Sequence, residues 1–171
     1  MDVKSRRSSN EASLASRPER FRRAYRIVSR RYATFDGSGT FRWGSRWVSP
    51  GRRVVHAAKT YALAVLENLV HWQTRDLPQT LVVIEVRIPE DVAQSRLDPS
   101  DVPGWDHPDY AASRVAGDAW YDACETAVLW VPSVVSPHEL NVLFNERHPE
   151  FRRVVVVPAV PAGVDPRLAA R

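Results

Sequence analysis

The chain has 171 residues, of which 44% are hydrophobic and 26% are charged, a balance typical of one globular domain with a real core. The longest apolar run is far shorter than the ~20 residues that a membrane-spanning helix needs, and the N-terminus lacks the apolar stretch of a secretory signal. A single cysteine, Cys124, excludes an internal disulfide framework. We therefore expect a cytoplasmic protein without a membrane partner.

Positive charge is concentrated at the N-terminus. Residues 1–31 contain ten Lys or Arg and three acidic residues, which gives a net charge of +7. The whole chain has a net charge of +4, so residues 32–171 have a net charge of −3. High charge with few apolar residues predicts that residues 1–20 form a flexible basic arm. The body lacks the basic face of a nucleic-acid-binding module, which argues against a direct role in nucleic-acid binding.

The apolar pattern predicts a mixture of strands and few helices. Residues 60–72 have a helical pattern with Thr60 as N-cap, and residues 117–124 begin or continue a short helix. Residues 98–109 form a long loop rich in Pro and Asp, of a kind that is often functional. Alternating or β-branched runs predict strands at 24–28, 53–58, 80–88, 126–131, 139–144 and 151–157. This order favours an α+β domain over a regular series of βαβ units.

The predicted helix at 60–72 carries one narrow polar strip on an otherwise apolar surface. The strip consists of Thr60, Ala64, Glu67, Asn68 and His71. It could face water, with Glu67 pairing loosely with His71 four residues on. The alternative is that the strip faces a pocket.

Several conventional sites are absent from the pattern. DGSGT (36–40) has two glycines but no following lysine or helical pattern, so it is no phosphate-binding loop. The five histidines lack the spacing of metal ligands. Ser133 follows a predicted strand as VPSVV, which is not the G-x-S-x-G elbow of hydrolases and by itself indicates a turn residue.

GSRWVSPG (44–51) places an arginine between small residues and a tryptophan, ahead of a Pro-Gly turn. Three roles for Arg46 agree with this pattern. It could clamp a phosphate, contact nucleic acid, or cover Trp47 at the surface.

Taken together in chain order, seven segments resemble the RES domain family, and the resemblance extends over residues 21–168. The segments are YRIV (25–28), FDGSGTFRWGSRWVSPG (35–51), VVHAAKTYALAVLENLVH (54–71), DVPGW (101–105), GDAW (117–120), VLWVPSVV (128–135) and HELNVLFNERHPEF (138–151). The resemblance implies an ADP-ribosyltransferase-like α+β fold. It also implies a toxin of a bacterial toxin–antitoxin pair, with a cognate helix-turn-helix (Xre-like) antitoxin that would mediate any contact with DNA.

The resemblance implies that NAD⁺ is a substrate rather than a cofactor, and that no metal is required. The motif arginine, glutamate and serine correspond to Arg26, Glu67 and Ser133, which are the expected catalytic residues. Residues expected to bind NAD⁺ are Arg26, Arg46, His56, Ser133 and Asn145. His56 departs from the tyrosine that the family usually has at this position.

The chemistry of NAD⁺ cleavage agrees with this set of residues. Nicotinamide leaves as a neutral molecule, so the reaction needs no general acid and hence no carboxylate pair of the glycosidase kind. Glu67 could accept a ribose hydroxyl hydrogen bond and stabilise the oxocarbenium-like transition state. Arg26 and Arg46 could bind the diphosphate. Water, phosphate or a protein side chain could attack the ribose, so a glycohydrolase, a phosphorylase and a protein ADP-ribosyltransferase all stay open.

Overall fold

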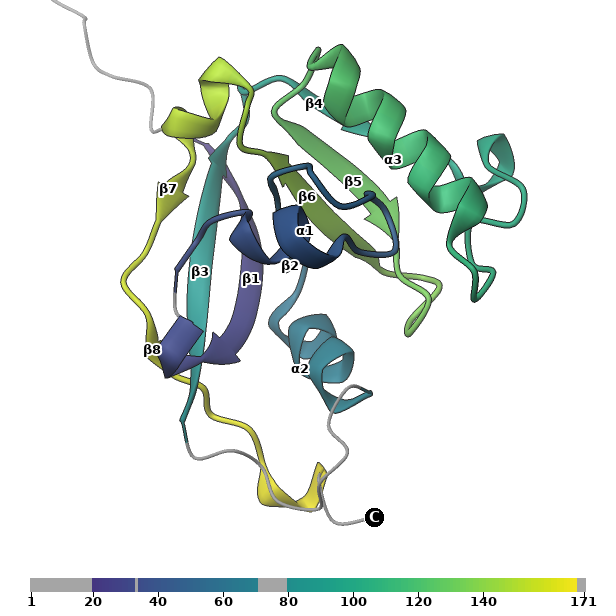
Figure 1. Cartoon of the computed structure of the whole chain (residues 1–171). Coiled ribbons are helices and arrows are strands. Elements are labelled where there is room, and N and C mark those ends of the chain that lie inside the picture. The colour runs from purple at the N-terminus through teal and green to yellow at the C-terminus, as the bar shows by residue number, and fades with distance from the viewer. Residues whose placement is uncertain (1–19, 33, 71–79, 169–171) are drawn as a thin grey trace, which may run out of the picture.

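Eight strands form one mixed sheet in the order β4-β5-β6-β2-β1-β3-β7, with β8 paired to β3 (Figure 1). The computed structural model describes residues 20–32, 34–70 and 80–168. The strand bounds are β1 Phe21–Ser29, β2 Val54–Ala58, β3 Leu81–Pro89, β4 Gln94–Arg96, β5 Val128–Pro132, β6 Leu140–Asn145, β7 Val155–Val156 and β8 Val160–Pro161. The α-helices of the described residues are α1 Ser38–Trp43, α2 Tyr61–Leu69 and α3 Ala111–Ala123. The expected α+β class is confirmed.

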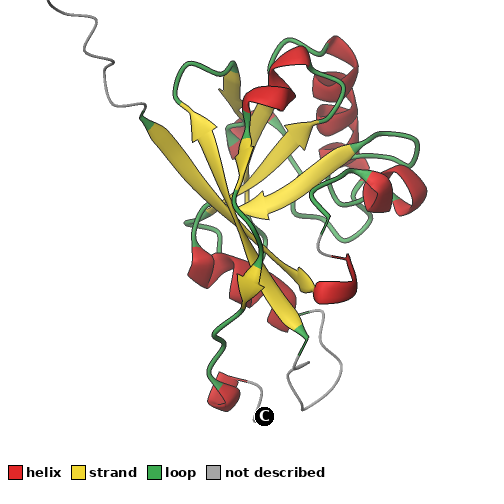
Figure 2. Cartoon of the chain, turned by 90° about the vertical axis from the view of Figure 1, so that its left-hand side faces the viewer, coloured by secondary structure: helices red, strands yellow, loops and turns green. Residues whose placement is uncertain are grey.

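The sheet is nearly divided in two between β1 and β2. Strand β1 pairs with β3 over nine residues, and β2 pairs with β6 over five. Between β1 and β2 only one pair is made, Tyr25 with Ala58. Figure 2 shows the strands of the two halves crossing at a large angle. This division leaves room for side chains and ligands on either side of the single pair.

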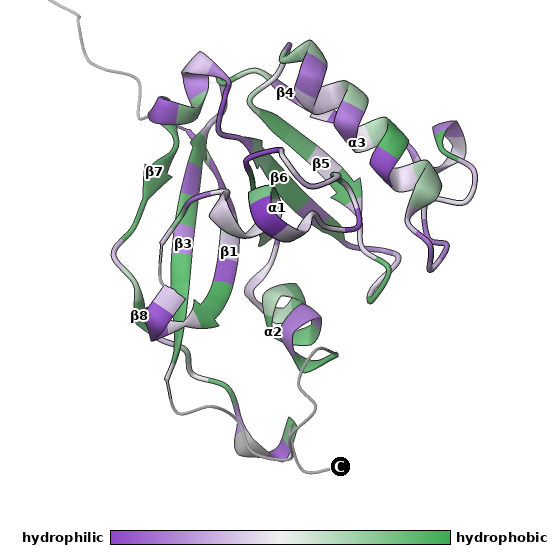
Figure 3. Cartoon of the chain, viewed as in Figure 1, coloured by the Kyte–Doolittle hydropathy of each residue, from purple (hydrophilic) through white to green (hydrophobic). Residues whose placement is uncertain are grey.

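The main apolar core lies between the two halves. It joins residues of β1 and β3, such as Ala24 and Val86, to residues of β2, β5 and β6, such as Phe144. Figure 3 shows how apolar residues dominate β3, β5 and β6. Two smaller clusters attach the helices: α2 packs on the half formed by β1 and β3, and α3 packs on β5 and β6.

Helix α2 begins as the sequence predicts. Thr60 is the N-cap, and its Oγ1 accepts a hydrogen bond from Leu63 N at 3.1 Å. The helix is less buried than expected, since Leu66 and Val70 are exposed. His71 and the end of the predicted helix at 72 lie outside the described residues, as do residues 1–19 of the predicted arm. No described helix is long and apolar enough to cross a membrane.

The predicted strand at 151–157 is wrong in its first half. Residues Pro149–Arg153 form a 3₁₀ helix, followed only by the two-residue β7. His148 Nδ1 accepts a hydrogen bond from Glu150 N at 3.1 Å, and the fixed φ of Pro149 suits the first turn of a helix. Local capping therefore outweighs the β-branched run that follows.

Helix α1 was not expected, because two glycines precede and interrupt it. Asp36 Oδ1 accepts from Ser38 N at 2.9 Å, and the Thr40 hydroxyl donates to Val54 O at 2.7 Å and accepts from Val54 N at 3.0 Å. These side-chain contacts hold a short turn that its propensity alone would not predict. The brief strands β4 and β8 were also missed, while α3 starts at Ala111 and so occupies more of the chain than predicted.

Candidate functional site

A cavity of about 320 Å³ lies beside α2 at the division between β1 and β2. It is lined by Tyr25, Arg26, Ile27, Val28, His56, Ala57, Ala58, Ala64, Glu67, Asn68 and Asn141. Ala64, Glu67 and Asn68 belong to the polar strip of the predicted helix. The strip therefore faces a pocket, and the alternative in which it faces water is wrong.

Glu67 is held in the cavity by two side chains from the other half of the sheet. Its Oε1 accepts hydrogen bonds from Ser133 Oγ at 2.7 Å and from Asn141 Nδ2 at 2.5 Å. No described residue donates a hydrogen bond to Oε2. The carboxylate is thus oriented through one oxygen, and the other can accept a hydrogen bond from a ligand.

Ser133 can donate its hydroxyl proton only toward Glu67. It follows the last residue of β5, is fully buried, and its Oγ accepts from Val135 N and Ser136 N, both at 3.1 Å. Two N–H donors occupy the lone pairs of the hydroxyl oxygen, so its single proton points at the remaining acceptor. Ser133 is therefore a turn residue, as its local pattern indicates, and also a rigid support for Glu67.

Arg26 crosses from β1 to β2 at the division of the sheet. Its Nη1 donates to the backbone oxygen of His56 at 2.8 Å, while its Nε is buried and has no described partner. Burial lowers the pKa of Arg26, and the charge of Asp36 partly offsets this effect. An arginine desolvated in this way interacts strongly with an anionic ligand.

His56 lines the same cavity, next to Arg26. Its Nε2 is buried without a described hydrogen-bond partner. Burial, with the neighbouring charge of Arg26, lowers the pKa of His56 to about 3. The imidazole is therefore neutral at physiological pH and offers a flat surface and one unsatisfied nitrogen.

Asn141 is a site residue that sequence reasoning missed. It lies on β6 opposite Ala58 of β2, and its amide reaches Glu67 across the division of the sheet. The available signal was a polar residue inside the apolar run ELNVLF, at a position where a strand side chain would be expected to face the core.

Arg46 lies outside this cavity, contrary to the placement expected from the sequence. Its Nη1 donates to the backbone oxygens of Trp105 at 3.3 Å and His107 at 2.9 Å, and its guanidinium lies 4.3 Å from the centre of the Tyr110 ring. It does not cover Trp47, which is buried and stacks on Trp105. Arg46 thus holds the loop 98–109 in place, and a contact with NAD⁺ stays a prediction.

Asn145 is also remote from the cavity. It is fully buried at the end of β6, where its Nδ2 donates to Tyr121 O at 3.1 Å and its Oδ1 accepts from Arg147 N at 3.0 Å. These bonds join β6 to the end of α3. The geometry gives Asn145 a structural role, and its predicted contact with NAD⁺ is not tested by it.

The arrangement of Arg26, Glu67 and Ser133 agrees with a match between residues 23–165 and the model of the RES domain. The chain belongs to the RES domain family. A relative named Toxin Res from Pseudomonas putida is 38% identical over 122 residues, which cover 70% of this chain and 82% of the relative. Another, named Prs ADP-ribosylating toxin, from Sphingobium sp. strain YBL2, is 37% identical over 122 residues, 69% of this chain and 76% of its own.

The fold is similar to that of a solved structure described as the M. tuberculosis MbcT–MbcA toxin–antitoxin complex. The TM-score is 0.70, with 16% identity and coverage of 88% of each chain. At this identity the likeness concerns the fold alone, and it agrees with the expected α+β class.

Two of the three RES motif residues line the cavity, and the third does not. Arg26 and Glu67 line it directly, whereas Ser133 acts on it through its bond to Glu67. Within residues 20–32, 34–70 and 80–168, no group of three or more His, Cys, Asp or Glu could hold a metal ion. The cavity therefore combines one oriented carboxylate, Glu67, with one desolvated guanidinium, Arg26.

Proposed function

We propose that this protein is a toxin that degrades NAD⁺ by cleaving the bond between nicotinamide and ribose. The observation that carries the proposal is the orientation of Glu67 by Ser133 and Asn141 in a cavity of about 320 Å³ that Arg26 also lines. That volume is near the lower end of the range for small-molecule sites, roughly 300–1,000 Å³, so it suits one end of NAD⁺ rather than the whole molecule.

Glu67 acts on the ribose. Its Oε2 accepts a hydrogen bond from a ribose hydroxyl, and the negative charge stabilises the oxocarbenium-like transition state. The bond between ribose C1′ and the nicotinamide nitrogen breaks, and its electron pair leaves with the neutral nicotinamide. The oxygen of water or phosphate, or an acceptor side chain, then forms the new bond at C1′, and any proton that it carries passes to solvent. Because the leaving group takes no proton, the one carboxylate among the described lining residues suffices.

Arg26 and His56 bind the substrate. The buried Nε of Arg26 is a donor for a phosphate or ribose oxygen, and the guanidinium charge attracts the diphosphate. Neutral His56 packs against the flat nicotinamide ring. Its imidazole does not add a positive charge next to the positively charged ring.

The alternative is a protein ADP-ribosyltransferase that uses the same cleavage and a protein side chain as acceptor. The name of the Sphingobium relative, Prs ADP-ribosylating toxin, supports this alternative. In either case the protein acts in the cytoplasm, where NAD⁺ is present, and a cognate antitoxin of the helix-turn-helix (Xre-like) kind neutralises it. The description of the MbcT–MbcA complex supports an antitoxin partner, and its helix-turn-helix kind rests on the sequence resemblance alone.

The test is a mass-spectrometric assay of NAD⁺ products, run with water alone, with phosphate, and with a bacterial protein extract. We expect free nicotinamide in all three, with ADP-ribose, its 1-phosphate or modified proteins identifying the nucleophile. Glu67→Gln is the inactive variant, and Glu125→Gln, an exposed glutamate on the loop after α3, is the matched control. An intact NAD⁺ pool after incubation with the folded wild-type protein contradicts the proposal.

A further inference from the structure

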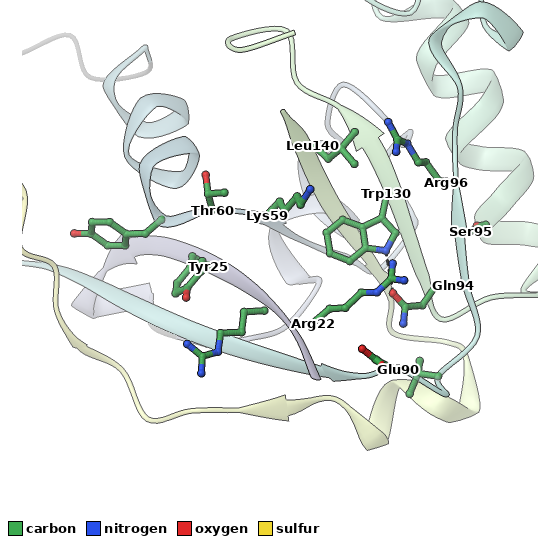
Figure 4. Close-up of a pocket in the computed structure, with 13 residues that line it drawn as sticks. Arg22, Tyr25, Lys59, Thr60, Glu90, Gln94, Ser95, Arg96, Trp130 and Leu140 are labelled. Atoms are coloured by element: carbon green, nitrogen blue, oxygen red, sulfur yellow. Dashed lines mark hydrogen bonds between the residues drawn. The ribbon is translucent and has the colours of Figure 1, made fainter. Parts of the chain in front are cut away.

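A second and larger cavity, of about 940 Å³, lies on the other side of the single pair between β1 and β2. Its lining comes from both halves of the sheet and from the start of α2 (Figure 4). The residues are Arg22, Arg23, Tyr25, Lys59, Thr60, Tyr61, Glu90, Val92, Gln94, Ser95, Arg96, Trp130 and Leu140. None of the RES motif residues lines this cavity, and the proposed reaction does not involve it.

The two cavities share Tyr25 and are otherwise distinct. Along β1, residues 22–23 line the large cavity and residues 26–28 line the Glu67 cavity. Along the chain from β2, residues 56–58 line the Glu67 cavity and residues 59–61 line the large one. The Tyr25–Ala58 pair therefore separates them.

The large cavity is basic. Four of its side chains, Arg22, Arg23, Lys59 and Arg96, carry positive charge, against the one carboxylate of Glu90. Arg23 is engaged with Glu85 at 3.8 Å. The ion pairs among the described residues involve none of the other three cations. Three cations from separate elements thus line one cavity and make no ion pair within the described residues, and with Glu90 counted the lining keeps a net positive charge, which favours an anionic ligand.

The wall of the cavity is aromatic and apolar. Figure 4 shows the Lys59 side chain between the rings of Tyr25 and Trp130, and the Arg22 side chain extending below Trp130 toward Gln94. The Trp130 indole is fixed, because its Nε1 donates to Gln94 Oε1 at 3.0 Å. An anion with a flat apolar group matches this combination better than a bare inorganic ion, because the ring faces can pack against that group.

The first turn of α2 also borders the cavity. Thr60 and Tyr61 line it, and Thr60 Oγ1 accepts a hydrogen bond from Leu63 N at 3.1 Å and donates one to Glu139 Oε2 at 2.9 Å. The helix N-terminus already has a carboxylate beside it, so the positive charge of the cavity comes from its Arg and Lys side chains.

We propose that this basic cavity binds a nucleoside phosphate at a site separate from the Glu67 cavity. The phosphate contacts Arg22, Lys59 and Arg96, and the base packs against Tyr25 and Trp130. The volume of about 940 Å³ is within the range of small-molecule sites, roughly 300–1,000 Å³. The proposal stands on this cavity alone and does not require NAD⁺ cleavage at Glu67.

The experiment is calorimetric titration of the full chain with AMP, with adenosine and inorganic phosphate titrated separately. We expect AMP to bind more tightly than either part, and its affinity to fall with salt because the contacts are ionic. The double variant Arg22→Ala/Lys59→Ala should bind AMP at least tenfold more weakly, since each charge-assisted contact is worth roughly a factor of ten. Arg42→Ala, an exposed arginine of α1 outside both cavities, should bind like wild type.

Glu67→Gln separates this site from the catalytic one. Removing that carboxylate would tighten phosphate binding in the Glu67 cavity, whereas AMP in the basic cavity should bind with unchanged affinity. Any one of three results overturns the proposal. The first is tighter AMP binding by Glu67→Gln, the second is no binding at millimolar AMP, and the third is wild-type AMP affinity in the folded double variant. The proposal is also overturned if AMP does not bind while a glutamate-rich peptide does, and if the binding of that peptide is lost in Arg22→Ala/Lys59→Ala. The surface is then a binding site for a protein.

Discussion

Ser133 Oγ donates to Glu67 Oε1 at 2.7 Å, joining two residues that lie 66 positions apart in the chain. The bond connects the end of β5 in one half of the sheet to α2, which packs on the other half. Because Ser133 is itself fixed by two backbone N–H donors, the position of the carboxylate follows from the turn after β5. The glutamate of the site is thus held by a long-range contact.

Glu67→Gln should keep the fold and remove most of the proposed NAD⁺-cleaving activity. The amide oxygen of glutamine can still accept from Ser133 and Asn141, so the packing is retained, while the charge that stabilises the transition state is lost. Contacts of this kind contribute about 2.7–4 kcal/mol, which corresponds to a loss of about 10²–10³-fold in kcat. Turnover measured by nicotinamide release checks this, with circular dichroism to confirm folding. A folded variant with wild-type turnover sinks the assignment of Glu67.

Asn141→Ala should lower kcat by about tenfold, the worth of one charge-assisted hydrogen bond, with little change in KM. Asn141 acts through Glu67, so its loss affects how well the carboxylate is placed rather than how tightly substrate binds. Steady-state kinetics separate the two quantities. A rise in KM at constant kcat contradicts a positioning role and indicates direct substrate binding. Asn68→Ala, on the same cavity wall but bonded to the backbone oxygens of Ile27 and Ala64, is the control.

Periodicity located the carboxylate of the site but not its partners. The strip that contains Glu67 and Asn68 is visible because a helix places residues three and four apart on one face. Helical periodicity cannot identify Asn141 and Ser133 as partners of Glu67, because the local sequence does not show which strand ends lie next to α2. The RES resemblance supplied Ser133 as a motif residue without the reason, which is its hydrogen bond to Glu67.

Arg46→Ala should loosen the loop 98–109 more than it weakens NAD⁺ binding. The guanidinium holds the backbone oxygens of Trp105 and His107, so its removal leaves these segments without their anchor. Hydrogen exchange at residues 105–110 should become faster. In a Glu67→Gln background, calorimetry should show a smaller loss of NAD⁺ affinity than Arg26→Ala causes. If hydrogen exchange at residues 105–110 is unchanged and NAD⁺ affinity falls strongly, Arg46 binds a phosphate of NAD⁺, which is the role that the sequence suggested.

Strands were easier to predict than short helical turns. β3 has a long β-branched run and appears close to its predicted bounds, whereas β1 was predicted by alternation at 24–28 and extends from Phe21 to Ser29. The Pro149–Arg153 turn depends instead on the capping contact of His148, and α1 depends on side-chain contacts of Asp36 and Thr40. A one-turn element gains little from periodicity, so its formation depends on contacts that only the folded chain provides.

His56 should make the protein lose stability as the pH falls. Its pKa is about 3 in the folded state, against about 6.5 in an unfolded chain. Below about pH 6.5 the unfolded state therefore binds the proton first, and the free energy of unfolding decreases as the pH approaches 3; above 6.5 the residue contributes nothing. Between pH 7 and 5 this is worth about 1–2 kcal/mol.

Urea unfolding of wild type and His56→Gln at these two pH values tests that contribution. The variant should lose less stability between them than wild type does, and His138→Gln, an exposed histidine, should behave like wild type. Equal pH dependence of wild type and His56→Gln would show that His56 is protonated in the folded protein.

Gly117→Ala should destabilise the fold through α3. A Cβ at Gly117 would lie 1.7 Å from the backbone oxygen of Trp47, so helix and loop would have to separate. Overpacking of this kind costs about 1–3 kcal/mol, and here the obstacle is backbone that cannot rotate away. The separation would also strain two bonds that fix the segment of Arg46: Ser113 Oγ to Arg46 O at 2.7 Å and Arg114 Nε to Ser45 O at 2.9 Å.

Gly39→Ala is the matched control, since a Cβ there meets nothing within 4 Å and alanine favours the short helix α1. Thermal unfolding of the two variants should show a lower Tm for Gly117→Ala and an equal or higher Tm for Gly39→Ala. Equal Tm values would mean that α3 can move off the Trp47 segment without loss. In that case the hydrogen bonds of Ser113 and Arg114 to the backbone of residues 45–46 would not be needed to fix that segment. Arg46 would then be positioned only by its bonds to the backbone oxygens of Trp105 and His107.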